Sequence, residues 1–257
     1  MDLIIPDWPD LPANVGALST TRRGGVSIAP FDDGSGSGTG GFNLGMHVTD
    51  CPLHVRENRK LLRTMLPAEP AWLTQVHGTV IVDAANLSGI PEADAGFTIA
   101  KGVVCAIMTA DCLPVLLCDQ NGRVVAAAHA GWRGLSSGIL EKTVARMRAA
   151  GADEITAWLG PAIGPNYFEV GEDVRQAFVA HEVSASGAFK PITAHGGKYL
   201  ADMYALAHAR LQRAGVHSIC GGEFCTVSDT RRFFSYRRDK ITGRNASLIW
   251  LKQEALF

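Results

Sequence analysis

Three apolar runs of strand length dominate the middle of the chain. Val103–Met108 and Leu113–Cys118 are separated by a short polar step, and Arg123–Ala128 follows after a turn. Continuous apolar runs of this length, bounded by turn residues, predict buried β-strands. Cys112 stands just before the second run and His129 just after the third. Because strand ends on a rigid scaffold often carry functional side chains, we expect the chemistry of the protein to lie here.

Strand-like and helix-like patterns interleave along the rest of the sequence. Period-2 or short apolar runs predict further strands over Val15–Thr21, Ala71–Val76, Thr79–Asp83, Ile155–Leu159, Arg232–Tyr236 and Ser247–Leu251. Apolar residues at helical spacing predict helices over Pro52–Met65, from Leu135 to the cap at Gly151, over Glu172–His181 and over Ala201–Ala214. This interleaving predicts mixed α/β content. The pattern shows no internal repeat and no domain boundary, so residues 1–257 are expected to form a single domain.

Composition and charge limit the classes of partner. Of 257 residues, 47% are hydrophobic and 19% charged, which is typical of a globular protein. The net charge of −1 lacks the basic excess of most nucleic-acid-binding surfaces. The first residues carry no cationic segment before an apolar one, and Asp111 interrupts the longest apolar stretch. We therefore expect a cytoplasmic location, with neither a membrane nor a nucleic acid as partner.

Cysteine usage favours free thiols over a disulfide framework. The chain has six cysteines and no C-x-x-C pair, and Cys105 and Cys118 sit in apolar runs typical of buried small hydrophobes. Any metal site must therefore be assembled from residues that are distant in sequence. The glycine- and serine-rich stretch Pro30–Gly41 is expected to form a mobile surface loop.

Five longer motifs, in order along the chain, resemble those of the YfiH family. That family has been called polyphenol oxidase (laccase), peptidoglycan editing factor and purine nucleoside phosphorylase, and it is related to the animal protein FAMIN. The resemblance extends from Thr21 to Trp250. Its motifs are Trp72–Gly78, Met108–Val115, Ala128–Gly134, Leu159–Pro165 and Phe233–Asp239.

The resemblance implies that His77, Cys112 and His129 are the ligands, and the catalytic centre, of one zinc ion. Two imidazoles and a thiolate leave the fourth tetrahedral position open, as catalytic zinc requires. Zinc with an open position lowers the pKa of bound water to about 7. The implied reaction is phosphate-dependent cleavage of purine nucleosides (adenosine, inosine, guanosine and methylthioadenosine), together with deamination of adenosine. Copper binding in vitro is also expected, because copper has the higher intrinsic affinity for such ligands.

The resemblance also points to residues that contact the substrates. Arg22 matches a Ser/Thr-Arg-x-Gly-Gly pattern, and Arg133 is a second cation close to His129, so both are candidates for binding phosphate. Asn43 and His47 lie in a segment resembling the family's Asn-Leu-Gly-x-His and are candidates for ribose or phosphate contacts.

The fold implied by the resemblance is α+β. Mixed β-sheets with outer helices would form a layered α/β/β/α sandwich, with the site in a cleft between strand ends. A monomer is expected.

Two other enzyme classes compete with the phosphorylase. In a cysteine hydrolase acting on a peptidoglycan precursor, Cys112 would be the nucleophile and His129 or His77 the base. In a copper-dependent polyphenol oxidase of the multicopper type, about ten histidines in His-x-His pairs would be needed. The chain has eight histidines and no His-x-His, which argues against the multicopper type. A non-catalytic, partner-binding role is the remaining alternative.

Overall fold

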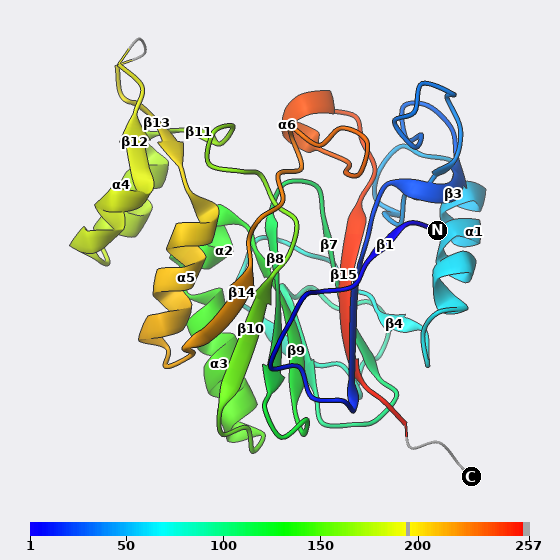
Figure 1. Ribbon diagram of the computed structural model, residues 1–257, viewed down its shortest axis with the longest axis horizontal. Coiled ribbons are helices and arrows are strands. Elements are labelled where there is room, and N and C mark those ends of the chain that lie inside the picture. The colour runs from blue at the N-terminus through cyan, green and yellow to red at the C-terminus, as the bar shows by residue number, and fades with distance from the viewer. Residues whose placement is uncertain (194–195, 254–257) are drawn as a thin grey trace.

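The chain folds into four layers, with two β-sheets packed face to face between outer helices (Figure 1). This computed structural model describes residues 1–193 and 196–253. The five-stranded sheet has the order β1 (Leu3–Ile4), β2 (Val15–Thr20), β15 (Asn245–Leu251), β7 (Val104–Thr109) and β4 (Pro70–Ala71). The six-stranded sheet has the order β14 (Ser218–Gly221), β10 (Ile155–Leu159), β8 (Leu113–Asp119), β9 (Val125–Ala130), β6 (Ala95–Thr98) and β5 (Ile81–Asp83).

Most strand pairs in the two large sheets are antiparallel, and three edge pairs, β4–β7, β5–β6 and β10–β14, are parallel. A small third sheet contains β11 (Glu169–Gly171), β13 (Lys198–Ala201) and β12 (Phe189–Pro191). Strand β3 (Arg23–Ser27) lies beside α1. The helices are α1 (Pro52–Arg63), α2 (Trp132–Ser136), α3 (Ile139–Ala149), α4 (Glu172–Val179), α5 (Met203–Arg213) and α6 (Tyr236–Asp239), with a short 3₁₀ helix at Val183–Ala188.

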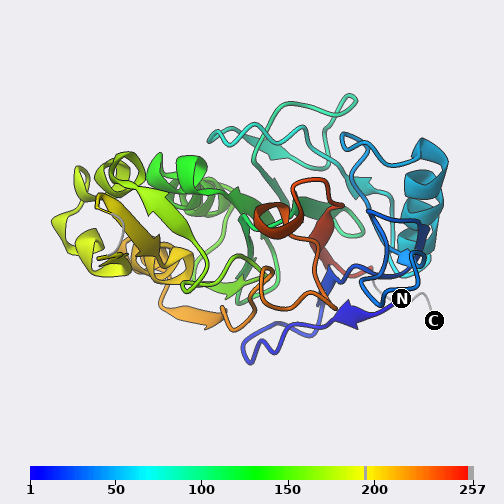
Figure 2. The same cartoon turned by 90° about the horizontal axis from the view of Figure 1, so that it is seen from above.

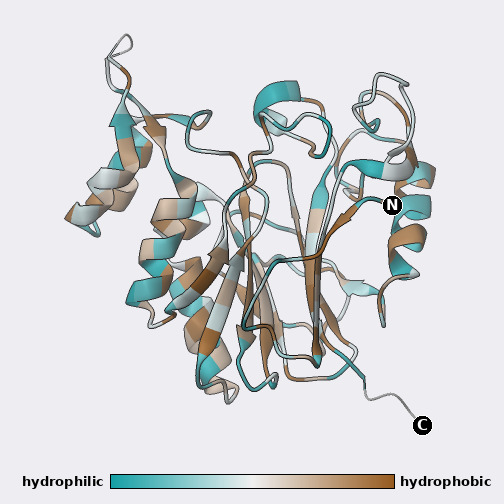
Figure 3. Cartoon of the chain, in the orientation of Figure 1, coloured by the Kyte–Doolittle hydropathy of each residue, from teal (hydrophilic) through white to brown (hydrophobic). Residues whose placement is uncertain are grey.

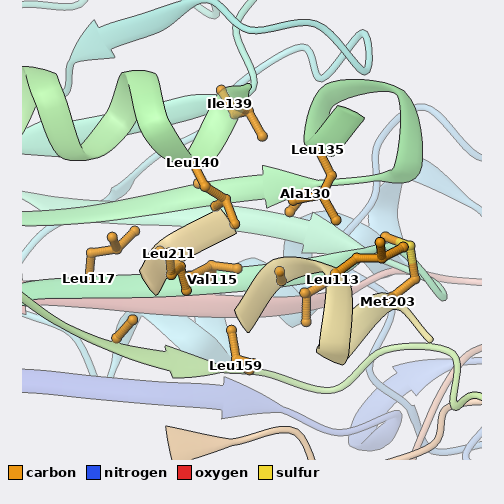
Figure 4. Close-up of a cluster of buried hydrophobic side chains, with 14 of the residues drawn as sticks. Leu113, Val115, Leu117, Ala130, Leu135, Ile139, Leu140, Leu159, Met203 and Leu211 are labelled. Carbon is orange, nitrogen blue, oxygen red and sulfur yellow. The ribbon is translucent and has the colours of Figure 1, made fainter. Parts of the chain in front are cut away.

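Strict alternation along the central strands explains the layering. On β8, Leu113, Val115 and Leu117 face one core, while Leu116 and Cys118 face the other. The first core lies between the six-stranded sheet and helices α3 and α5, where β8 side chains meet leucines and isoleucines of the helices (Figure 4). The second core lies between the two sheets. Because side chains of a strand alternate between faces, one strand can serve both cores.

Helix α1 covers the outer face of the five-stranded sheet. Its buried Leu62 packs with Ala106 of β7 and Leu248 of β15 in a third core. Seen from above, α1 lies at one end of the molecule, and α4 with the small sheet lies at the other (Figure 2). The strands of the central layers are largely hydrophobic, whereas polar residues gather on the outer helix faces and the loops (Figure 3). The layered α+β sandwich expected from the resemblance is therefore confirmed.

Two predicted strands are wrong, and side-chain hydrogen bonds explain both. Of the predicted strand over 71–76, only Ala71 belongs to a strand. The Gln75 amide instead bonds to the backbone of Met108, with Nε2 donating to the carbonyl at 2.8 Å and Oε1 accepting from the amide at 2.9 Å. The predicted strand over 232–236 is a loop that leads into α6, because Ser235 caps that helix by accepting from the Arg238 amide.

The helix predicted to start at Leu135 is two helices. Gly138, at φ 90°, breaks it into α2 and α3, because a left-handed residue cannot continue a right-handed helix. Helices α1, α4 and α5 and strands β2, β7, β8, β9, β10 and β15 lie at the predicted places with ends shifted by a few residues. Within the described residues, no helix is long and apolar enough to cross a bilayer.

Candidate metal centre and substrate cleft

The three side chains predicted to bind metal converge on one point. One nitrogen of His77, one of His129 and the Cys112 sulfur all lie within 4.8 Å of one another. His77 Nε2 is 3.6 Å from Cys112 Sγ, and the two imidazole rings are 4.7 Å apart at an angle of 70°. Across residues 1–193 and 196–253, this is the one group of three or more histidine, cysteine or acidic side chains arranged to share a metal ion.

Strand register places two of these ligands. In the β8–β9 pair, Leu113 lies opposite Ala130 and Pro114 opposite His129. Cys112, one residue before β8, is therefore brought beside the end of β9 that carries His129. A slip of one residue would turn His129 to the other face of the sheet, so the pairing itself specifies the site.

A buried aspartate organises the other side of the centre. Asp94 immediately precedes β6, and the register of the β6–β9 pair continues to place it opposite His129. Its carboxylate accepts from His129 Nδ1 at 2.8 Å and from the backbone amides of Val76, His77 and Gly78 at 3.3, 2.9 and 2.6 Å. With its proton on Nδ1, His129 presents Nε2 to the metal position, the usual arrangement for a histidine that ligates zinc.

Two non-glycine residues of the candidate centre have left-handed backbone, the ligand candidate His77 and the neighbour of Cys112, Asp111. His77 has φ 60° and Asp111 has φ 91°. At His77, the Asp94 carboxylate fixes the backbone by accepting from the His77 amide. At Asp111, the side-chain carboxylate accepts from Thr226 Oγ1 and from the Arg237 amide, both at 2.6 Å. Such conformations cost about 1–3 kcal/mol each and persist where the surroundings fix them, commonly at functional sites.

Gly131 keeps the space between the ligands open. A Cβ on this residue would lie 2.8 Å from His77 Cδ2, 3.2 Å from Cys112 Sγ and 3.4 Å from His129 Nε2. Any larger side chain would therefore occupy the position on which the donor atoms converge. This steric requirement explains why a glycine stands in the His-Ala-Gly-Trp motif.

The electrostatics favour a thiolate. Burial acts to raise the pKa of Cys112, but hydrogen bonding and positive charge from His129 and His77 lower it to about 6. Burial acts to lower the pKa of His129, and the hydrogen bonds to Asp94 and Cys112 raise it to about 9. Burial opposes the Asp94 carboxylate, and its bonds from His129 and the Gly78 amide lower its pKa. A thiolate and two imidazoles are the donor types that zinc prefers, so these residues fit a zinc ion.

His77, Cys112 and His129 line a cleft of about 640 Å³. Its volume lies in the range of small-molecule binding sites. Its other lining residues are Met46, His47, Arg59, Trp72, Leu73, Thr74, Gln75, Ile90, Met108, Thr109, Ala110, Tyr236 and Arg244.

Of the four predicted substrate residues, only His47 lines the cleft. Arg22 is buried outside the lining, where Nη2 pairs with Asp32 at 2.9 Å. Asn43 is fully buried and bonds to Asp50, so it supports the His47 segment from behind. Arg133 is exposed and stacks over Trp132 at 4.5 Å, also outside the lining.

Three residues of the site were missed by the sequence reasoning: Asp94, Arg59 and Arg244. Arg59 lies on α1 and Arg244 directly before β15, and both line the cleft. Neither stands at a predicted strand corner. Arg59 stands beside Lys60 on a predicted helix, and basic residues there usually mark a solvated face.

The sequence matches a family model described as multi-copper polyphenol oxidoreductase laccase over residues 16–252. A relative from Escherichia coli named purine nucleoside phosphorylase YfiH is 53% identical and covers 97% of this chain and 98% of its own. The chain belongs to the YfiH family.

Other members of the YfiH family agree in sequence and structure. A purine nucleoside phosphorylase from Pseudomonas aeruginosa is 54% identical over 97% of this chain and 98% of its own. The crystal structure of a Neisseria meningitidis protein superposes with a TM-score of 0.90 at 49% identity, covering 98% of this chain and all of the other. A Bacillus licheniformis YfiH structure has a TM-score of 0.82 at 29% identity, covering 93% of each chain.

Proposed function

We propose that this protein is a zinc-dependent purine nucleoside phosphorylase that also deaminates adenosine. The observation that carries the proposal is the convergence of His77, Cys112 and His129 in a cleft of about 640 Å³. The names of the Escherichia coli and Pseudomonas aeruginosa relatives support the phosphorylase assignment. Adenosine, inosine, guanosine and methylthioadenosine are the proposed substrates.

In phosphorolysis, a phosphate oxygen forms a bond to C1′ of the ribose while the bond from C1′ to the purine nitrogen breaks. The electron pair leaves with the purine, which takes up a proton, and ribose 1-phosphate remains. Apolar walls formed by Leu73, Ile90 and Met108 give the purine ring a surface to pack against. Asp94 holds His129 in one tautomer and orientation throughout.

A zinc ion held by the three ligands would supply Lewis-acid chemistry and an activated water, which suit replacement of the adenosine amino group. The chain's own contribution is to fix the ligands. Asp94 orients His129 and shapes the turn at His77, and Gly131 leaves the shared position free.

A cysteine hydrolase acting on a peptidoglycan precursor is the second candidate, and one observation favours it. Cys112, His129 and Asp94 form a thiol, imidazole and carboxylate in series, with a lowered thiol pKa and a raised imidazole pKa. Cysteine nucleophiles are activated by such an arrangement. His77, which the hydrolase does not require, is the feature that favours the metal centre.

A multicopper oxidase finds less support, although the family model carries that description. Multicopper catalysis requires several copper sites. Over the described part of the chain, a single three-ligand group is found.

The test combines metal analysis with a phosphate-dependent assay. Purified wild-type protein is expected to contain one zinc per chain. It should release free base and a sugar 1-phosphate from the four nucleosides only when phosphate is present: ribose 1-phosphate from three of them and 5-methylthioribose 1-phosphate from methylthioadenosine. It should form inosine from adenosine without phosphate. A Cys112→Ser variant should lose zinc and both activities, whereas a Cys51→Ser variant, altered at an exposed cysteine, should keep them. Stoichiometric zinc in the Cys112→Ser protein would instead favour the hydrolase.

A further inference from the structure

Two arginines hold the same short backbone segment from different sides. Arg59 Nε donates to the Leu44 carbonyl at 3.0 Å. The side chain of Arg244 packs against Gly45, the residue after Leu44, so closely that a Cβ on Gly45 would lie 2.8 Å from Arg244 Cγ. Asn43 Oδ1 accepts hydrogen bonds from the backbone amides of Gly45 and Arg244 at 3.0 and 2.9 Å, which holds the two backbone segments together. Both arginine side chains therefore lie against the segment just before His47, and all three side chains line the cleft.

Among the described residues, neither guanidinium forms an ion pair, although the charge of Glu69 acts on Arg59 and the charges of Cys112 and Asp111 act on Arg244. Within the described residues, Arg59 and Arg244 have no carboxylate oxygen within the 4.0 Å of an ion pair. Arg244 Nη1 bonds only to the carbonyls of Thr242 and Gly243 at 3.2 and 3.0 Å. Arg59 stacks over Trp72 at 4.0 Å. Since a guanidinium has five N–H donors, each side chain keeps donors for a ligand.

Arg22 provides the contrast. It is buried, but it forms an ion pair with the Asp32 carboxylate, and it also donates to the backbone carbonyls of Asp32 and Thr230. Partly buried cations without a counterion are unfavourable unless an anion joins them.

Burial also affects the pKa values of the three cleft side chains, as it does that of Arg22. Burial lowers the pKa of Arg59 to about 10 and also lowers that of Arg244. Partial burial, then repulsion by Arg244 and Arg59, lowers the pKa of His47. A neutral His47 can still donate one hydrogen bond to an oxyanion.

We propose that Arg59, Arg244 and His47 form an anion subsite that binds the inorganic phosphate co-substrate in the metal cleft. The assignment rests on the proposed phosphorylase function. Arginine forks match the oxygens of phosphate in charge and geometry. The stacking of Arg59 on Trp72 and the backbone anchors of Arg244 fix both groups before phosphate arrives, which suits a positioned nucleophile.

The test measures phosphate binding directly, on zinc-loaded full-length protein, by isothermal titration calorimetry. Arg59→Gln and Arg244→Gln are expected to weaken the binding of inorganic phosphate by about tenfold or more. They should raise the KM for phosphate to a similar extent, while leaving the KM for nucleoside and the zinc content unchanged. Arg56→Gln on the same helix and Arg231→Gln, both at exposed arginines, are the matched controls.

The outcomes separate the subsite from the proposed function. If the wild type phosphorolyses nucleosides and both cleft variants keep its phosphate affinity, the subsite is wrong and the function stands. If the wild type binds phosphate through Arg244 but cleaves no nucleoside, the function is wrong and the subsite stands. Adenosine monophosphate distinguishes the source of the phosphate group. Arg244-dependent binding of this nucleotide, with no such binding of inorganic phosphate, would overturn the assignment to the co-substrate.

Discussion

The Asp94→Asn substitution tests how the metal centre is held together. Each carboxylate oxygen accepts two donors. Oδ1 accepts from the His77 amide and His129 Nδ1, and Oδ2 accepts from the amides of Val76 and Gly78. Asparagine keeps one acceptor oxygen and places an NH₂ group against the other two donors. We therefore expect two charged hydrogen bonds to be lost, at about 1.5–3 kcal/mol each, or about 3–6 kcal/mol of unfolding free energy.

The effect on zinc is expected to be separate from the loss of stability. Replacing a carboxylate that orients a ligating histidine lowers metal affinity by about 10–100-fold, which corresponds to about 1.4–2.7 kcal/mol. The Kd for zinc is measured by competition with a chelator, on protein shown by circular dichroism to be folded at the working temperature. Urea denaturation of the metal-free protein gives the stability term.

Asp119 offers a matched control. Its carboxylate is also fully buried and accepts four bonds, two from backbone amides and two from the Arg123 guanidinium. It lies at the far end of β8 from Cys112. Asp119→Asn should destabilise the fold without changing the Kd for zinc. An unchanged Kd in Asp94→Asn, or an equal loss in both variants, would refute the role assigned to Asp94.

The remaining predictions concern space, acid stability and the buried ion pair. Gly131→Ala should weaken zinc binding by about tenfold or more, because its Cβ would lie 2.8 Å from His77 Cδ2, and chelator competition would show it; wild-type affinity would mean that the ligands can move aside. Burial acts to raise the pKa of Asp119, but its bonds from the Arg123 guanidinium and two backbone amides lower it. The Asp119 carboxylate therefore stabilises the fold fully above its ordinary pKa of 3.8, and this stabilisation is lost as the pH falls through the lower pKa of the folded state. Urea denaturation should accordingly show the difference between wild type and Asp119→Asn shrinking below about pH 4, and a constant difference would contradict this. Arg22→Gln should cost about 1–3 kcal/mol of unfolding free energy by removing the ion pair of Asp32, which then keeps only the bond from the Gly34 amide. The KM for phosphate should stay at its wild-type value, and a raised KM would restore Arg22 as a phosphate ligand.

The set His77, Cys112 and His129 is predicted from the resemblance to the YfiH family, and the apolar pattern independently marks the corners at Cys112 and His129. Cys112 and His129 flank strands whose apolar runs are continuous, and the hairpin between those strands is short, so their proximity follows from the pairing. Asp94 gave no such signal. It follows Pro91 in an irregular segment, and its partners lie 16–35 positions away in sequence. Only the completed sheet brings them together.

Local pattern failed where side chains replaced the backbone as hydrogen-bond partners. The apolar run through Phe233 and Phe234 is buried like a strand, but Ser235 ends it by capping α6. The side-chain amide of Gln75 likewise makes hydrogen bonds with the backbone of Met108 on β7, in place of a neighbouring strand. Six of the missed strands, β1, β6, β11, β12, β13 and β14, have four residues or fewer, so their periodicity is too short to read. The seventh, β3, has five residues, of which two are glycines.

The two halves of the proposed site rest on different layers of the fold. His129 and Asp94 belong to the six-stranded sheet, whereas Arg244 leads into the centre of the five-stranded sheet and Arg59 lies on the helix that covers it. Cys112 lies on the connection from β7 to β8, which passes from one sheet to the other. Substitutions in the two halves share no hydrogen-bond partner, so their effects on zinc affinity and on phosphate affinity should add. Non-additive losses in an Asp94→Asn, Arg244→Gln double variant would show that the two halves are coupled, as the charge interaction of Arg244 with Cys112 would allow.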